Sequence, residues 1–67
     1  MEKQRDHLSA LEKVREVMVG ERRRLAGHMA DSEMRSTSAA GDLLAIQEQI
    51  EAIDRAIADE TVQLADI

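Results

Sequence analysis

Large apolar residues recur along the C-terminal half of the chain at alternating steps of three and four positions. They are Leu43, Ile46, Ile50, Ile53, Ile57, Leu64 and Ile67. A helix presents one face at this period, and a sustained 3.5-residue repeat is typical of helices that supercoil around one another. Most flanking positions are polar or small, so the apolar stripe is narrow, as in a coiled-coil seam. The pattern predicts a helix over about residues 42–66 with its seam packed against another helix.

One position of this repeat is polar, because Glu60 stands where an apolar residue is due. An isolated polar residue in a seam typically fixes the register of the packed helices at some loss of stability. We expect Glu60 to act in this way by pairing with Arg15 or Arg22 of the N-terminal half.

The N-terminal half carries a similar but less regular stripe, predicted to lie on one side of a helix over about residues 3–34. Its apolar members are Leu8, Leu11, Val14, Met18, Leu25 and Met29. Glu21 or Arg22 interrupts the stripe, and Gly20 and Gly27 each disfavour a helix by up to about 1 kcal/mol relative to Ala. A break into two short helices at Gly20 is therefore an alternative.

The segment between the two stripes, DSEMRSTSAAGD over residues 31–42, contains few large apolar side chains. Ser, Thr and Asp cap helix starts, and Gly41 can adopt the left-handed conformation that often ends a helix. We expect a turn within about residues 35–41, so that residues 1–67 form a single all-α domain, an antiparallel two-helix hairpin. A single long helix in a coiled coil is the alternative, because one heptad column continues across this segment.

Two hairpin registers bring the two stripes together. One pairs Leu25 with Ile46 around an earlier turn, and the other pairs Leu25 with Ile53 around a later turn. We favour the later turn because it places Gly41 at the turn and gives Ile67 a partner.

The composition and the small size of the chain predict that it packs against further helices. The 67-residue chain has no cysteine and no aromatic residue, and 34% of its residues are charged, which is typical of long helices and coiled coils. A chain this small is marginally stable alone, and disulfides are excluded. Two helices leave one side of each stripe open, and a second hairpin would close that side in a four-helix bundle. We expect a homo-oligomer, with a dimer favoured, or a protein partner.

The expected oligomer or partner seam draws on both stripes. Its residues are Leu11, Val14, Met18, Leu25, Leu43, Ile46, Ile50, Ile53, Ile57, Leu64 and Ile67. A closed, symmetric dimer is the commonest outcome for such a surface.

The charges are distributed unevenly along this acidic chain, which has a net charge of -5. Residues 1–35 carry eight basic and seven acidic side chains, whereas residues 36–67 carry seven acidic side chains and one basic residue, Arg55. An acidic helix beside an arginine-bearing helix gains complementarity at the edges of the seam. The acidic second helix also suggests an alternative function, a phage-type inhibitor that blocks a basic site on a host protein.

Arg22, Arg23 and Arg24 form the one basic cluster in the sequence. They are candidate phosphate contacts, and they suggest a second alternative, a small nucleic-acid-associated regulator. Successive residues of a helix point about 100° apart, so the three arginines spread around the helix. The negative net charge and the lack of aromatic residues for base stacking also disfavour nucleic acid as a partner.

No residue pattern indicates catalysis, a cofactor or a metal. His7 and His28 lie three heptads apart, about 30 Å along a helix, so one chain cannot bring both to one ion. No apolar run approaches the roughly 18 residues of a membrane span, and the N-terminal segment is too polar for a secretory signal. We therefore expect a cytoplasmic, non-enzymatic helical interaction or assembly module without a small-molecule substrate, such as a small adaptor, chaperone or regulatory subunit.

Overall fold

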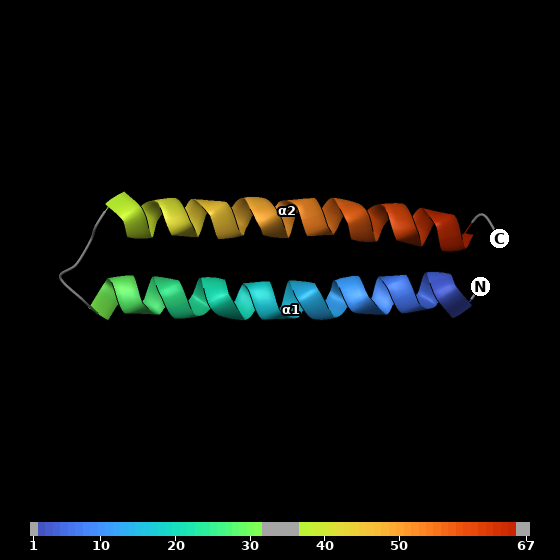
Figure 1. The fold of residues 1–67 in the computed structure, drawn as a ribbon, viewed down its shortest axis with the longest axis horizontal. Coiled ribbons are helices and arrows are strands. Elements are labelled where there is room, and N and C mark those ends of the chain that lie inside the picture. The colour runs from blue at the N-terminus through green and yellow to red at the C-terminus, as the bar shows by residue number, and fades with distance from the viewer. Residues whose placement is uncertain (1, 32–36, 66–67) are drawn as a thin grey trace.

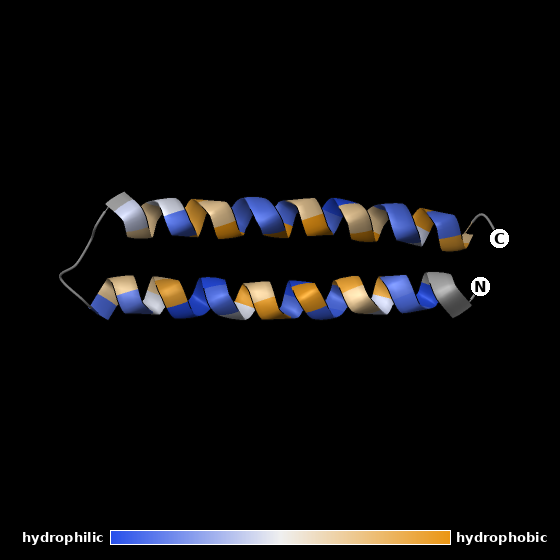
Figure 2. Ribbon diagram, in the orientation of Figure 1, coloured by the Kyte–Doolittle hydropathy of each residue, from blue (hydrophilic) through white to orange (hydrophobic). Residues whose placement is uncertain are grey.

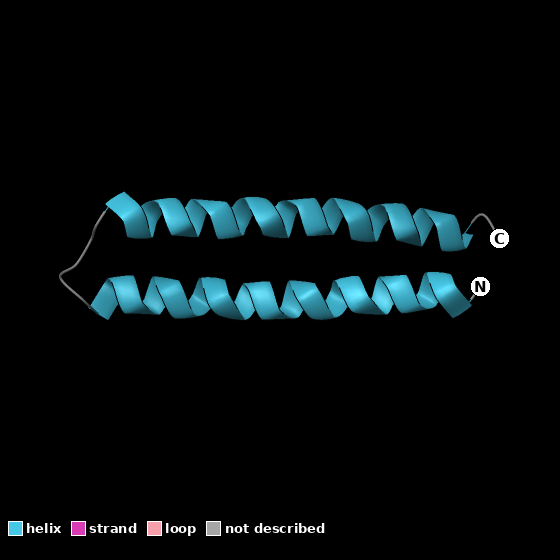
Figure 3. Cartoon of the chain, in the orientation of Figure 1, coloured by secondary structure: helices cyan, strands magenta, loops and turns pink. Residues whose placement is uncertain are grey.

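The chain folds into two long helices that lie side by side. The computed structural model describes residues 2–31 and 37–65, and it describes side chains over residues 5–31 and 38–65. Helix α1 spans Glu2–Asp31 and helix α2 spans Thr37–Ala65, and the two run antiparallel along a molecule 52 Å long (Figure 1). Every described residue is helical (Figure 3). The predicted all-α hairpin is confirmed, and the alternative of one unbroken helix is wrong.

Helix α1 runs through Gly20 and Gly27 without a break, so the alternative of two short helices is wrong. A side chain added at either glycine would meet nothing within 4 Å, which shows that neither serves a close approach of another element. Each glycine disfavours the helix by about 1 kcal/mol relative to Ala, and the good helix formers around it offset this cost. Packing of one face against α2 adds to this local preference.

Helix α2 begins earlier than predicted. The expected turn at residues 35–41 is wrong over residues 37–41, which are helical, while residues 35 and 36 lie outside the described part of the chain. Gly41 is in α2 and does not have a positive φ. Ala39 and Ala40 are strong helix formers, and their preference for the helix outweighs the single unfavourable glycine that follows them.

The apolar stripe of α2 lies against α1. Ile50 is its most buried member and is 2% exposed. The other stripe residues with described side chains are half-buried, whereas most of the residues between them are exposed; they are Leu43, Ile46, Ile53, Ile57 and Leu64. Hydrophobic and hydrophilic stretches are interspersed along both helices (Figure 2). Ile67, the last member of the predicted seam, lies outside the described residues.

The packed side of α1 differs in one respect from the predicted stripe. Leu8, Leu11, Met18, Leu25 and Met29 are half-buried, as the burial of a stripe requires. Val14 is 47% exposed, whereas Val19, which the prediction did not include, is only 9% exposed. The described helix thus turns the side that carries Arg15 and Val19 toward α2, rather than the side that carries Val14.

The contacts between the helices define their register. Arg15 of α1 contacts Asp54 of α2, and Arg22 contacts Gln47, so two residues one heptad apart on α1 meet two residues one heptad apart on α2. The favoured register, which pairs Leu25 with residue 53, would place Arg22 about nine residues away from Gln47 and is wrong. The other predicted register lies within two residues of the observed one. Early initiation of α2 explains this outcome, because it moves the connection between the helices toward the N-terminus.

Candidate interaction surface

The described part of the hairpin buries few side chains completely. Val19 and Ile50 are the only described residues in the buried class, and no described polar or charged residue is buried. Two packed helices shield each apolar stripe from one side, so the remaining stripe residues stay half-buried. The half-buried apolar residues along the two edges of the seam therefore form the candidate interaction surface.

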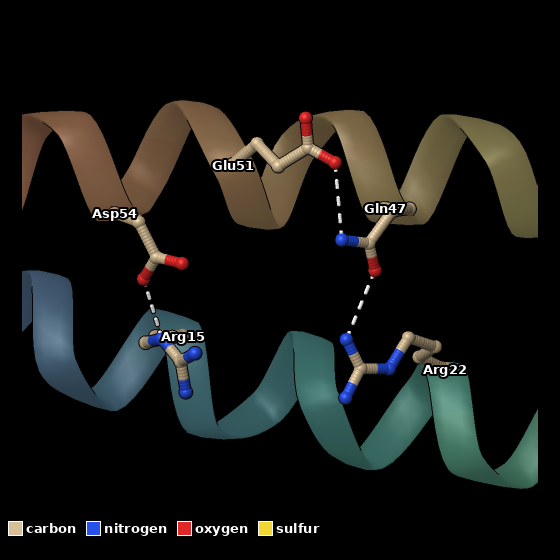
Figure 4. A network of polar contacts seen from close by, with 5 residues as sticks. All are labelled: Arg15, Arg22, Gln47, Glu51 and Asp54. Carbon is tan, nitrogen blue, oxygen red and sulfur yellow. Dashed lines mark hydrogen bonds and ion pairs between the residues drawn. The ribbon is translucent and has the colours of Figure 1, made fainter.

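Polar contacts cross the seam on one flank. The Nε of Arg15 donates a hydrogen bond to Oδ1 of Asp54, and these two side chains also form an ion pair (Figure 4). Arg22 donates to Oε1 of Gln47 over 2.9 Å, and Gln47 in turn donates to Oε2 of Glu51 over 3.0 Å (Figure 4). Both arginines therefore reach across from α1 to polar groups of α2, which ties the register to specific side chains.

Arg15 and Arg22 stand in the seam repeat of α1, where an apolar side chain would be usual. A three-four repeat that includes them runs along the whole helix: Leu8, Leu11, Arg15, Met18, Arg22, Leu25 and Met29. Hydrophobicity favours Val14 at this point of the stripe, whereas the spacing favours Arg15. The expected pairing of Glu60 with one of these arginines is wrong, because Arg15 contacts Asp54 and Arg22 contacts Gln47.

The ion pairs shift the acid–base properties of the groups that form them. The hydrogen bond to Asp54, followed by the charge of that carboxylate, raises the pKa of Arg15. Within α1, Arg24 donates to Glu21 over 2.8 Å, and this hydrogen bond and the charge of Arg24 lower the pKa of Glu21 from its ordinary value. The same pair raises the pKa of Arg24. Both pairs are accessible to solvent, where ion pairs contribute little to stability.

Two of the three clustered arginines are engaged by other side chains of the hairpin. Arg22 reaches across to Gln47 of α2, while Arg24 turns back to Glu21 in its own helix. Arg23 makes no hydrogen bond or ion pair with any other described residue. Two of the three candidate phosphate contacts therefore already have partners.

Two shallow hollows lie along the flank that bears Arg23. The interhelical hollow, about 500 Å³, is formed by both helices and is lined by Arg22, Arg23, Ala26, Ala40, Leu43, Leu44 and Gln47. The α1 hollow, about 440 Å³, is lined by Glu12, Lys13, Arg15, Glu16, Val19, Gly20 and Arg23. Arg23 belongs to both linings, so the hollows adjoin each other. The interhelical hollow is mostly apolar and has no carboxylate in its lining, which is unusual for a chain with a net charge of -5.

Several large apolar side chains are exposed on the described helices. Val14 is 47% exposed, Val17 64%, Leu44 60% and Val62 56%. Leu44 alone among these four belongs to the lining of a hollow. Scattered exposed apolar residues are ordinary, whereas an exposed apolar residue beside an apolar depression is typical of a contact surface.

No protein-family model matches this chain, and no curated protein and no solved structure matches it either. The assignment of a function therefore rests on the geometry of the hairpin.

The described residues contain no group of three His, Asp or Glu side chains arranged to hold a metal ion. His7 and His28 are both exposed on α1. Neither described helix has the length together with the apolar character that crossing a bilayer requires.

Proposed function

We propose that this chain is a non-enzymatic helical interaction module, which acts by packing its hairpin against other helices in a bundle. The observation that supports this proposal most directly is the incomplete burial of the seam. Of the predicted seam residues with described side chains, Ile50 alone is buried, and the rest are half-buried or exposed. Covering the open flank of the seam with another pair of helices would remove this apolar area from water, at about 25 cal/mol for each Å².

The shape of the molecule also favours this function over a catalytic one. The hairpin is 52 Å long but only 14 by 12 Å in cross-section, so its two depressions are shallow and open to solvent. Enzyme sites usually lie in concave pockets that exclude water and bring several polar groups together. An elongated amphipathic hairpin instead offers a long surface to a bundle, and we take a homodimer as the simplest such assembly.

The polar partners of two of the three arginines weigh against the nucleic-acid alternative. A phosphate-binding surface would need several free basic groups on one side, whereas Arg22 and Arg24 contact Gln47 and Glu21. We therefore propose a protein partner rather than a nucleic acid.

Sedimentation equilibrium of the purified chain, from about 1 to about 100 µM, tests the proposed function. The proposal predicts a mass above the 7.5 kDa of one chain at the higher concentrations. A 7.5 kDa species across the whole range, together with no protein retained on the immobilised chain, would contradict it.

A further inference from the structure

The interhelical hollow lies next to an apolar side chain that nothing covers. Leu44 forms part of the rim of the hollow and is 60% exposed. Ala26 of α1 and Ala40 of α2 also line the hollow, and both are themselves exposed and too small to fill it. One surface therefore carries both an apolar projection and an apolar depression, which is what a self-complementary contact needs.

Building on the proposed function, we infer that a second copy of this chain occupies the interhelical hollow. The two copies are related by a two-fold axis parallel to the helices, so that both hairpins point in the same direction. In this arrangement α1 of each copy lies against α2 of the other. The product is a four-helix bundle in which Leu44 of each copy covers the hollow of its partner.

The symmetry determines which residues meet. A two-fold axis parallel to the helices keeps every residue at the same height as its own copy. Leu44 is on the rim of the hollow, so Leu44 of the second copy lies at the height of Ala26 and the hollow of the first. The contact forms twice in each dimer and buries two leucine side chains that are 60% exposed in one hairpin.

Face-to-face hairpins that point in opposite directions would instead set α2 of one copy against α2 of the other. Leu44 would then not reach the α1 side of the partner's hollow, where Ala26 leaves space. The same-direction arrangement brings Leu44 to that side.

The charges on the same flank agree with the proposed contact. Arg23 and Glu48 make no hydrogen bond or ion pair with any other described residue. Because Arg22 lies beside Gln47, Arg23 of one copy and Glu48 of the other would differ by less than about 5 Å in height. Opposite charges would therefore meet at the edge of the apolar contact, where they favour this orientation.

Sedimentation equilibrium of Leu44→Asp tests which face is used, with Val17→Asp as the control. Val17 is 64% exposed and lines neither hollow, and it stands nine residues before Ala26, so it lies on the opposite side of α1. We expect Leu44→Asp to raise the dimer dissociation constant at least about tenfold, and Val17→Asp to change it by less than about threefold. A dimer that tolerates both substitutions equally would overturn this inference while leaving the proposed function intact, and a wild-type monomer would remove both.

A distance measurement on the native surface tests the symmetry without disturbing the contact. The chain has no cysteine, so Ser38→Cys introduces a single site for a spin label at an exposed position near the start of α2. Same-direction hairpins predict a label-to-label distance below about 30 Å, because only the width of the bundle separates the labels. Opposite hairpins would place the labels near opposite ends of the bundle, about 40 Å apart or more, and that result would overturn the inference.

Discussion

The two helices of the hairpin contribute different things to the same seam. The described seam of α2 is apolar except at Glu60, and it contains Ile50, which is 2% exposed. The seam of α1 alternates apolar residues with Arg15 and Arg22, and both arginines contact polar groups of α2. Each helix buries one apolar residue, Val19 or Ile50, so both helices supply the apolar contact. The arginines of α1 add polar contacts that restrict how the two helices can slide along each other.

We expect the largest effect from a substitution in the apolar contact between the helices. Ile50→Ala removes most of the side chain that is best buried in α2, and we expect a loss of about 2–5 kcal/mol in the free energy of unfolding. Urea denaturation followed by far-ultraviolet circular dichroism measures this loss, since the chain has no aromatic reporter. Val62→Ala is the control on the same helix, and a loss as large as that of Ile50→Ala would contradict the assignment of the core.

A smaller effect is expected from the matching substitution in α1. Val19→Ala removes two methyl groups from a side chain that is 9% exposed, and we expect a loss of about 1.5 kcal/mol. Val17→Ala, at a position 64% exposed on the same helix, should change the free energy of unfolding by less than about 0.5 kcal/mol. Equal losses at the two valines would show that α1 packs through a different side.

A double-mutant cycle on Arg22→Ala and Gln47→Ala tests the polar contact between the helices. We expect a coupling free energy of about 1 kcal/mol, because the hydrogen bond is partly buried between the helices. The parallel cycle with Arg23→Ala in place of Arg22→Ala should give little coupling, since Arg23 makes no hydrogen bond with Gln47. Similar coupling in both cycles would mean that the register does not depend on Arg22.

The smallest effect concerns an ion pair within α1 and depends on pH. Arg24 lowers the folded-state pKa of Glu21, so the stabilisation by this pair is present above the unfolded-state pKa of about 4.3 and is lost as the pH falls through the folded-state pKa. We expect the difference in unfolding free energy between wild type and Glu21→Gln to shrink between pH 7 and pH 3. In an Arg24→Ala background, the same comparison should show no change that depends on pH, and a persistent change would assign the shift to another group.

The sequence was sufficient to predict the two helices and the stripe of α2, because a sustained apolar repeat determines one face of a helix. It predicts less about α1, because hydrophobicity favours Val14 whereas the spacing favours Arg15. The start of α2 differs from the prediction because the helix preference of Ala39 and Ala40 outweighs the preference of Gly41 for a turn. The apolar pattern allows two registers equally well. The polar contacts of Arg15 and Arg22 distinguish them, and the apolar pattern contains no information about these contacts. The interhelical hollow could not be predicted, because it depends on small side chains from both helices meeting in one register.

One hairpin leaves its seam partly uncovered, and we propose that further copies of the chain cover it. The dependence of the thermal midpoint on protein concentration tests this claim most directly, because assembly of the folded chain stabilises it by mass action. We predict that the midpoint, followed by circular dichroism at 222 nm, rises steadily as the concentration increases from about 1 to about 100 µM. A midpoint that stays constant over this range would show that the hairpin unfolds as a single chain, and it would contradict the account.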